Sequence, residues 1–153
     1  MNKFFAFVVF LLCGHSSFSQ FAYPYAEIKL EKPSDYKQAE PMALNAANFL
    51  LSTPYKKDDA DRNTAFLFLV NWTKGSMNYH FELYGVILEL KDNREIMSLL
   101  IPAMVKFCLE NKTLGSNVTL IEASAVKTVL DYCNDPTKNF TLTKKVRKKL
   151  EGN

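Results

Sequence analysis

The sequence feature that most constrains the fold is a segment in the second half of the chain, residues 96–109, which is apolar on nearly every side. Asp92 and Glu95 stand before it in capping-box-like positions, which indicate the start of a helix. A helix without a polar face is buried at the centre of its domain. Pro102 lies inside it and is expected to bend the helix without ending it, because apolar residues continue on both sides.

Apolar residues also recur at helical spacing in five further segments, which predict the surrounding helices. Asp58, Asp59 and Asp61 supply N-terminal caps for one of them, and Gly75 stands at its expected C′ position. The short loops between these segments favour antiparallel neighbours. The five segments are residues 33 or 41 to 51, residues 59–74, residues 78–90, residues 116 or 117 to 133, and residues 143–150.

Residues 20–32 have a different pattern, in which Phe21, Tyr23 and Tyr25 alternate with other residues. This alternation predicts an extended arm that lies across the helices. Residues 20–153 have a length typical of one domain. We therefore expect an all-α fold, as a single-domain helical bundle or a short stack of antiparallel helical hairpins, with an extended N-terminal arm.

The first 19 residues have the three parts of a secretory signal peptide. A basic start at Lys3 precedes the apolar run Phe4–Leu12, which is shorter than the ~20 residues that span a bilayer. Ser17 and Ser19 are the small residues that a signal peptidase reads, so Gln20 is the expected new N-terminus. The expected localisation is secreted or periplasmic.

Two alternatives for the N-terminal segment stay open. A lipoprotein would be anchored at Cys13, although Leu12 stands where that signal requires a small residue. A buried N-terminal helix would account for the apolar run, although the run has neither a polar face nor a cap.

The overall charge is close to balanced, with 19 basic and 16 acidic residues in the whole chain. This balance predicts no binding to nucleic acid, and no transmembrane segment is expected beyond residue 19. The one local charge cluster is Lys144–Lys149, which could dock on anionic lipid or on an acidic partner. We favour the simpler interpretation of a solvated helix whose cations suit its own dipole.

No motif predicts a catalytic residue, a cofactor or a bound metal. Residues 59–63 resemble the start of a calcium loop, but Thr64 replaces the required glycine and Val70 the bidentate glutamate, so helix capping accounts for the acids. His80 is the single histidine after residue 19, which rules out two-histidine metal motifs, and no nucleophile elbow accompanies it. Five acids are equal candidates for paired-carboxylate chemistry, so none is singled out: Glu82, Glu89, Glu95, Glu110 and Glu122.

Cys108 and Cys133 are the two cysteines that would remain after signal cleavage. An oxidising compartment favours a disulfide between them. In an antiparallel hairpin, however, they would lie roughly 20 Å apart along the second helix, whereas a disulfide requires Cα atoms within about 7 Å. We therefore predict two free thiols on apolar faces.

Several segments resemble uncharacterised exported helical proteins of Gram-negative bacteria. They are Lys32-Pro33-Ser34-Asp35-Tyr36 with Ala39-Glu40-Pro41, then residues 48–54, residues 107–112 and residues 130–133. The resemblance implies a bacterial secreted or periplasmic setting. It implies no activity and no catalytic residue.

The leading hypothesis is therefore an exported, non-enzymatic protein that binds another envelope or secreted protein or has a structural role. One alternative is a periplasmic inhibitor or immunity-type protein directed against a hydrolase. The other alternative is a hydrolase that uses carboxylates.

Overall fold

The computed structural model describes residues 24–152, which are mostly helical, with no β-strand in that range. The predicted all-α fold class is confirmed. The α-helices are α1 (Pro33–Gln38), α2 (Glu40–Ser52), α3 (Ala60–Gly75), α4 (Gly85–Glu89), α5 (Arg94–Glu110), α6 (Val118–Asn134) and α7 (Lys144–Leu150), and the 3₁₀ turns are η1 (Tyr25–Glu27), η2 (Lys112–Leu114) and η3 (Pro136–Lys138). The expected signal peptide, Cys13 and the first residues of the arm, 20–23, lie outside the described residues.

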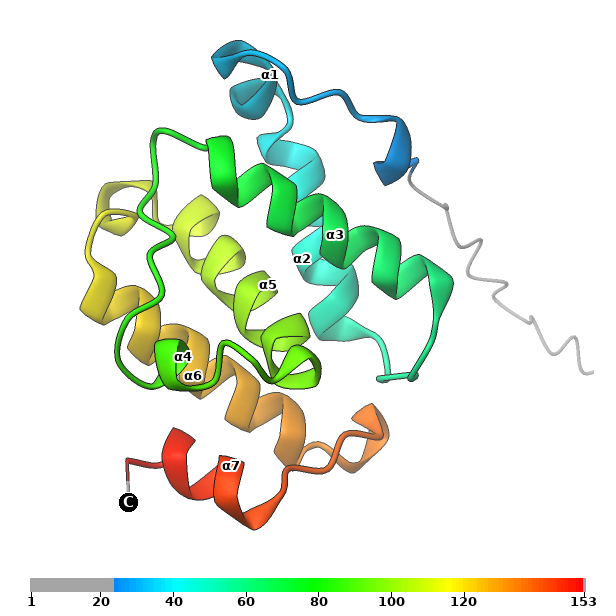
Figure 1. Cartoon of the computed structure of the whole chain (residues 1–153), viewed down its shortest axis with the longest axis vertical. Coiled ribbons are helices and arrows are strands. Elements are labelled where there is room, and N and C mark those ends of the chain that lie inside the picture. The colour runs from blue at the N-terminus through cyan, green and yellow to red at the C-terminus, as the bar shows by residue number, and fades with distance from the viewer. Residues whose placement is uncertain (1–23, 153) are drawn as a thin grey trace, which may run out of the picture.

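Helix α5 is the central element, as its sequence predicts. It contacts α2, α3 and α6, and Figure 1 shows it between α2 and α3 on one side and α6 on the other. The helix continues through Pro102 without interruption, as predicted. Its buried residues cover most of its circumference: Ile96, Met97, Leu99, Leu100, Pro102, Ala103, Met104, Val105, Cys108 and Leu109.

The cap of α5 differs from the prediction. The Asn93 side chain, and not Asp92, accepts a hydrogen bond from the Ile96 backbone N–H at 3.2 Å. Asn93 is therefore the N-cap, and Asp92 is exposed in the preceding turn. Asparagine and aspartate cap helices about equally well. Because Asp92 and Asn93 are neighbours, the sequence leaves the start of α5 uncertain by one residue.

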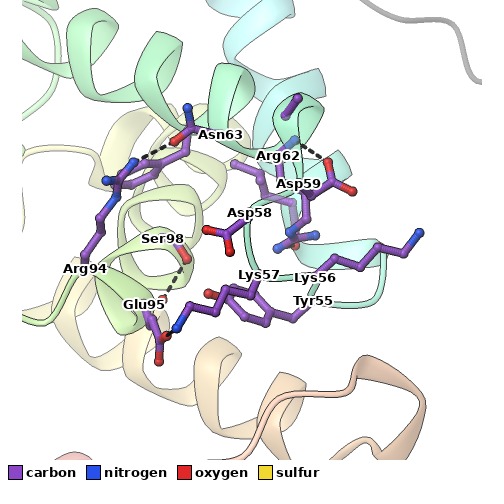
Figure 2. A pocket seen from close by; sticks show the side chains of 13 residues that line it. Tyr55, Lys56, Lys57, Asp58, Asp59, Arg62, Asn63, Arg94, Glu95 and Ser98 are labelled. Atoms are coloured by element: carbon purple, nitrogen blue, oxygen red, sulfur yellow. Dashed lines mark hydrogen bonds and ion pairs between the residues drawn. The ribbon is translucent and has the colours of Figure 1, made fainter.

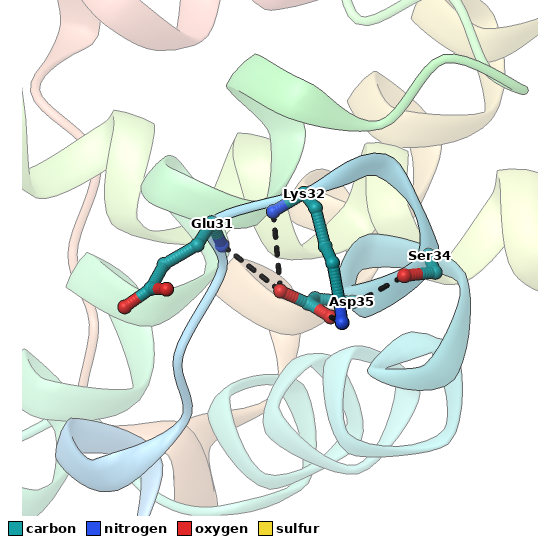
Figure 3. Close-up of polar contacts among 4 residues, drawn as sticks. All are labelled: Glu31, Lys32, Ser34 and Asp35. Atoms are coloured by element: carbon teal, nitrogen blue, oxygen red, sulfur yellow. Dashed lines mark hydrogen bonds and ion pairs between the residues drawn. The ribbon is translucent and has the colours of Figure 1, made fainter.

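The first predicted helix is two helices, so both of its alternative starts occur. Helix α1 begins at Pro33, and its Asp35 carboxylate accepts hydrogen bonds from the backbone N–H groups of Glu31 and Lys32, each at 3.1 Å (Figure 3). Helix α2 follows with Pro41 in its first turn. Its buried face is made mainly of alanines, which allow close approach to α5: Ala43, Ala46 and Ala47, with Leu50.

Helix α3 begins at the predicted cap, where the Asp59 carboxylate accepts a hydrogen bond from the Arg62 N–H at 2.9 Å. Gly75 is the last residue of the helix and not a left-handed C′ residue, which corrects the prediction. A methyl group at Gly75 would stand 2.1 Å from Cζ of Tyr36. The glycine is therefore needed because the Tyr36 ring lies against it.

The predicted helix over residues 78–90 is wrong, since only Gly85–Glu89 is helical. Gly85 has φ of +50°, a left-handed conformation that no right-handed helix can continue through. Before it, Tyr79 and Phe81 lie against Trp72, with ring centroids 6.0 and 5.6 Å away. The apolar spacing in this segment thus belongs to an irregular loop and a short helix.

The described part of the N-terminal arm lies against α3 (Figure 1). Tyr25 stacks on Phe68 with ring centroids 5.4 Å apart. The arm is not wholly extended, because Tyr25–Glu27 forms the turn η1. The prediction of an extended arm is therefore only partly correct.

Helices α6 and α7 lie where the sequence predicts them. Asn117 caps α6 by accepting from the Leu120 N–H at 3.1 Å, and Thr143 caps α7 by accepting from the Val146 N–H at 3.3 Å.

Cys108 and Cys133 are free thiols, as predicted, the first buried and the second half-buried. Between residues 24 and 152, no helix has the length and apolar character needed to cross a membrane.

Candidate functional site

The C-terminal end of α2 is held by a buried arginine. Arg62, in the first turns of α3, is only 6% exposed. Its guanidinium donates to Oγ1 of Thr53 at 2.7 Å and to the Leu50 carbonyl at 2.9 Å. The last carbonyls of a helix have no partner within the helix and carry its negative dipole end, so a guanidinium is well suited to them.

Helix α6 and the turn η3 bind to the same end of α2. The Tyr132 hydroxyl donates to the Thr53 carbonyl at 2.8 Å, and the Tyr55 N–H donates to the Lys138 carbonyl at 2.7 Å. Burial raises the pKa of Tyr132, which keeps the hydroxyl protonated as a donor. Helix α3, which follows α2 directly, and the distant segment of α6 and η3 are therefore fixed to the same end of α2.

The Tyr55 ring adds aromatic contacts at this end of α2. The Phe140 ring meets it edge-on at 4.8 Å between centroids, and the Arg62 guanidinium lies 5.5 Å from its centre. A cation beside an aromatic face is attracted by the negative charge of that face. The loop that follows α2 thus starts from a fixed position.

A cleft of about 580 Å³ opens beside the C-terminal end of α2, between the α2–α3 loop and the first turns of α3 and α5. Leu50 and Phe66 form its apolar wall. Figure 2 shows the polar side chains that reach it from the loop, from α3 and from α5. The ends of two helices and a fixed loop therefore define its shape.

Charged side chains of both signs line this cleft. Nζ of Lys57 lies 3.7 Å from Oε1 of Glu95, and the Arg94 guanidinium donates to Oδ1 of Asn63 at 2.6 Å. Both contacts join α5 to the opposite side of the cleft. The Asp58 carboxylate lies between the side chains of α3 and those of α5 in Figure 2.

Asp58 has a left-handed backbone, with φ of +61°. This conformation is uncommon for a residue with a side chain, although aspartate tolerates it better than most. It turns the chain sharply just before the Asp59 cap, and the Asp58 side chain is left exposed. The arrangement presents mixed charges to solvent, and it suits ion pairing with a charged ligand.

The acids considered for carboxylate chemistry are not brought together. Only Glu95 lines this cleft. Each of three others has a partner elsewhere: Glu89 with Lys149, Glu110 with Lys106, and Glu122 with the Val86 N–H. Glu82 is exposed on the loop before α4.

The other residues that the sequence analysis considered either cap a helix or are exposed. Asp59 caps α3 and Asp61 is exposed, as expected for helix capping. The His80 side chain is exposed, and its backbone N–H donates to the Gly115 carbonyl at 3.0 Å. Across residues 24–152, no three histidine, cysteine, aspartate or glutamate side chains are grouped so that they could hold a metal ion.

Sequence analysis missed the role of Arg62. The sequence did contain an indication of this role, because a cation in the first turns of a helix is disfavoured by the helix dipole. An arginine at that place indicates a partner elsewhere in the fold. The identity of that partner depends on tertiary packing, which brings Thr53 to it.

The sequence matches no family model, and no curated protein and no solved structure is detectably similar to this chain. What the structure itself defines is an all-α protein with an open, mixed-charge cleft at the C-terminal end of α2.

Proposed function

We propose that this is an exported, non-enzymatic protein that binds a charged segment of another envelope or secreted protein in the cleft beside α2. The observation that carries the proposal is the set of exposed charges of both signs around one cleft of fixed shape. Lys57, Asp58 and Arg94 can each exchange water or an intramolecular contact for an opposite charge on the partner. Such complementary charges determine which partner binds and how fast it associates.

The setting of the carboxylates supports binding over catalysis. A carboxylic acid that donates a proton in a hydrolase lies in apolar surroundings that keep it protonated. Glu95 instead has a side chain that is 56% exposed and pairs with Lys57. Asp58 is exposed as well. These carboxylates are therefore better placed for ion pairs than for acid catalysis.

Affinity capture with the tagged chain from its own envelope fraction tests the proposal. We expect the wild type to enrich a partner, and the double variant Lys57→Glu and Arg94→Glu to lose at least about 90% of it, since two attractive contacts become repulsive. The matched control is Lys29→Glu with Lys37→Glu. It makes the same charge change at two exposed lysines of the arm and α1, outside the cleft.

Equal recovery of the partner by both double variants would contradict the proposal. Identification of the captured protein as a hydrolase, with inhibition that depends on the same two residues, would assign the protein to the inhibitor class.

A further inference from the structure

The C-terminal helix α7 has three lysines without a partner. Lys144, Lys145 and Lys148 are exposed, and none of the side-chain hydrogen bonds or ion pairs of the described residues involves them. The two other cations of the helix are engaged, Arg147 with Asn134 and Glu151, and Lys149 with Glu89. The free charges of α7 are therefore all lysines.

Local helix energetics account for Lys148 but not for Lys144 and Lys145. Cations are favourable near the C-terminal end of a helix, which covers Arg147, Lys148 and Lys149. Lys144 and Lys145 instead occupy the first turn, next to the positive end of the dipole. Two like-charge pairs at i and i+4 add further repulsion: Lys144 with Lys148, and Lys145 with Lys149. The first turn of α7 thus contains lysines whose charges are unfavourable for the stability of the helix.

Charge is also distributed unevenly over the molecule. Between Pro136 and Leu150 there are six basic residues and no acidic one, whereas the rest of the described chain has twelve basic and sixteen acidic residues. A nearly neutral protein therefore has a positive end at η3 and α7. Acids do face α7 on one side, where Glu89, Asp92 and Glu95 line a groove against Lys145 and Lys149. Lys144 and Lys148 lie about 100° further around the helix, away from that groove.

Exposed apolar side chains lie on α4, beside this positive end. Tyr84 is 56% exposed and Leu88 is 48% exposed, one helical turn apart. The ion pair between Lys149 and Glu89, at 2.8 Å, joins the end of α4 to α7, and both helices lie at the same end of the molecule in Figure 1. These two apolar side chains and the exposed lysines of α7 thus lie at one end of the molecule.

We infer that the α4–α7 surface, made of Tyr84, Leu88, Lys144 and Lys148, docks on anionic lipid at a membrane surface. Lysines near such a surface are attracted by its negative potential, while tyrosine and leucine enter the boundary between headgroups and acyl chains.

An acidic protein fits this surface less well. The cores of protein interfaces are depleted in lysine and enriched in arginine, and recognition of a single carboxylate or phosphate favours the planar guanidinium. Here the free cations are point charges suited to a diffuse negative surface. The inference does not depend on the cleft beside α2.

Vesicle co-sedimentation of the full chain tests it, with phosphatidylcholine vesicles and with vesicles containing about one-third phosphatidylglycerol. We expect binding that requires phosphatidylglycerol and falls steeply as salt is raised from about 0.01 M to about 1 M, which shortens the Debye length from about 30 Å to about 3 Å. The apolar segment at residues 4–12 would instead give binding to neutral vesicles that salt does not reduce. The two contributions are therefore separable.

The double variant Lys144→Gln, Lys148→Gln should reduce the phosphatidylglycerol-dependent partition coefficient by about 25-fold, since each lysine near the surface contributes about a factor of five. The matched control is Lys29→Gln, Lys37→Gln, which removes the same charge at two exposed lysines elsewhere. It should change binding less than about threefold, and circular dichroism verifies that both variants are folded. Leu88→Ser should weaken binding severalfold.

Equal losses in the two double variants would overturn the inference, because they would show that net charge alone controls binding. Tighter binding of the wild type to polyglutamate than to the anionic vesicles would also overturn it, and would assign the surface to an acidic protein.

Discussion

At the scale of single residues, Arg62 is the clearest case of a side chain that fixes the fold. It is the one buried charged residue among residues 24–152, and its guanidinium donates to the Leu50 carbonyl and to Thr53 Oγ1, with no carboxylate paired to it. A guanidinium keeps its charge at any ordinary pH. The contact should therefore be insensitive to pH and sensitive to mutation.

Replacing Arg62 by Ala should lower the free energy of unfolding by roughly 2–4 kcal/mol, because buried carbonyls would lose charged donors and a cavity would form. Urea unfolding followed by circular dichroism measures the change. Arg94→Ala is the control, since Arg94 lines the same cleft but is exposed. It should change stability by no more than about 1 kcal/mol. Similar losses for the two variants would mean that Arg62 does not hold the end of α2.

The cysteines give a second test at this scale. Burial raises the pKa of Cys108 to about 12 and that of Cys133 to about 11, from an ordinary value of 9.0. Because the thiolate is the reactive form, both should react slowly with alkylating reagents at neutral pH in the folded protein. Thiol titration of the denatured, unreduced protein should find both thiols of Cys108 and Cys133 free. Finding neither would mean that they are joined.

The same pKa shifts predict how the stability of the fold changes at alkaline pH. Above about pH 9 the unfolded chain loses thiol protons that the folded chain keeps up to about pH 11 for Cys133 and about pH 12 for Cys108. The unfolded state then binds fewer protons, so stability falls as pH rises through this window. Serine at both positions should make the decline less steep.

At the scale of helices, the sequence predicts those elements that have their own cap and a continuous apolar face. Helices α3, α5 and α6 meet this condition and lie within a residue or two of their expected bounds. The loop before α4 does not. Tyr79 and Phe81 lie against Trp72, a contact from another element, and Gly85 takes a left-handed conformation that local spacing does not show.

The central position of α5 predicts a contrast between two methionines. Met104 is 2% exposed and Met77 is 81% exposed. Met104→Ala should cost roughly 2–5 kcal/mol through lost burial and a cavity, whereas Met77→Ala should stay within about 0.5 kcal/mol. Denaturant unfolding of both variants compares them directly. A small effect at Met104 would mean that α5 is not packed as described.

At the scale of the whole molecule, the all-α class follows from the sequence, but the cleft does not. Lys57 and Glu95 are neighbours across it, although they belong to a loop and to a helix separated by α3 and α4. Their approach depends on how α3 packs against α5 and on the Arg62 contact with α2. No spacing within one element predicts either contact.

Export is a prediction for the chain as a whole, and it concerns residues outside the described range. Mass spectrometry of the protein recovered from the periplasm or the medium should find Gln20 at the N-terminus, in open or cyclised form. Recovery of the intact form beginning at Met1 from the cytosol would contradict export.

The central claim is that the cleft beside α2 is the surface that meets the partner. The most direct measurement places a photoreactive amino acid at Lys57 and, as the control, at Lys37 on α1, and cross-links the chain in living cells. We expect one discrete cross-linked partner from the Lys57 position and none from Lys37. The same partner from both positions, or none from Lys57, would contradict the account.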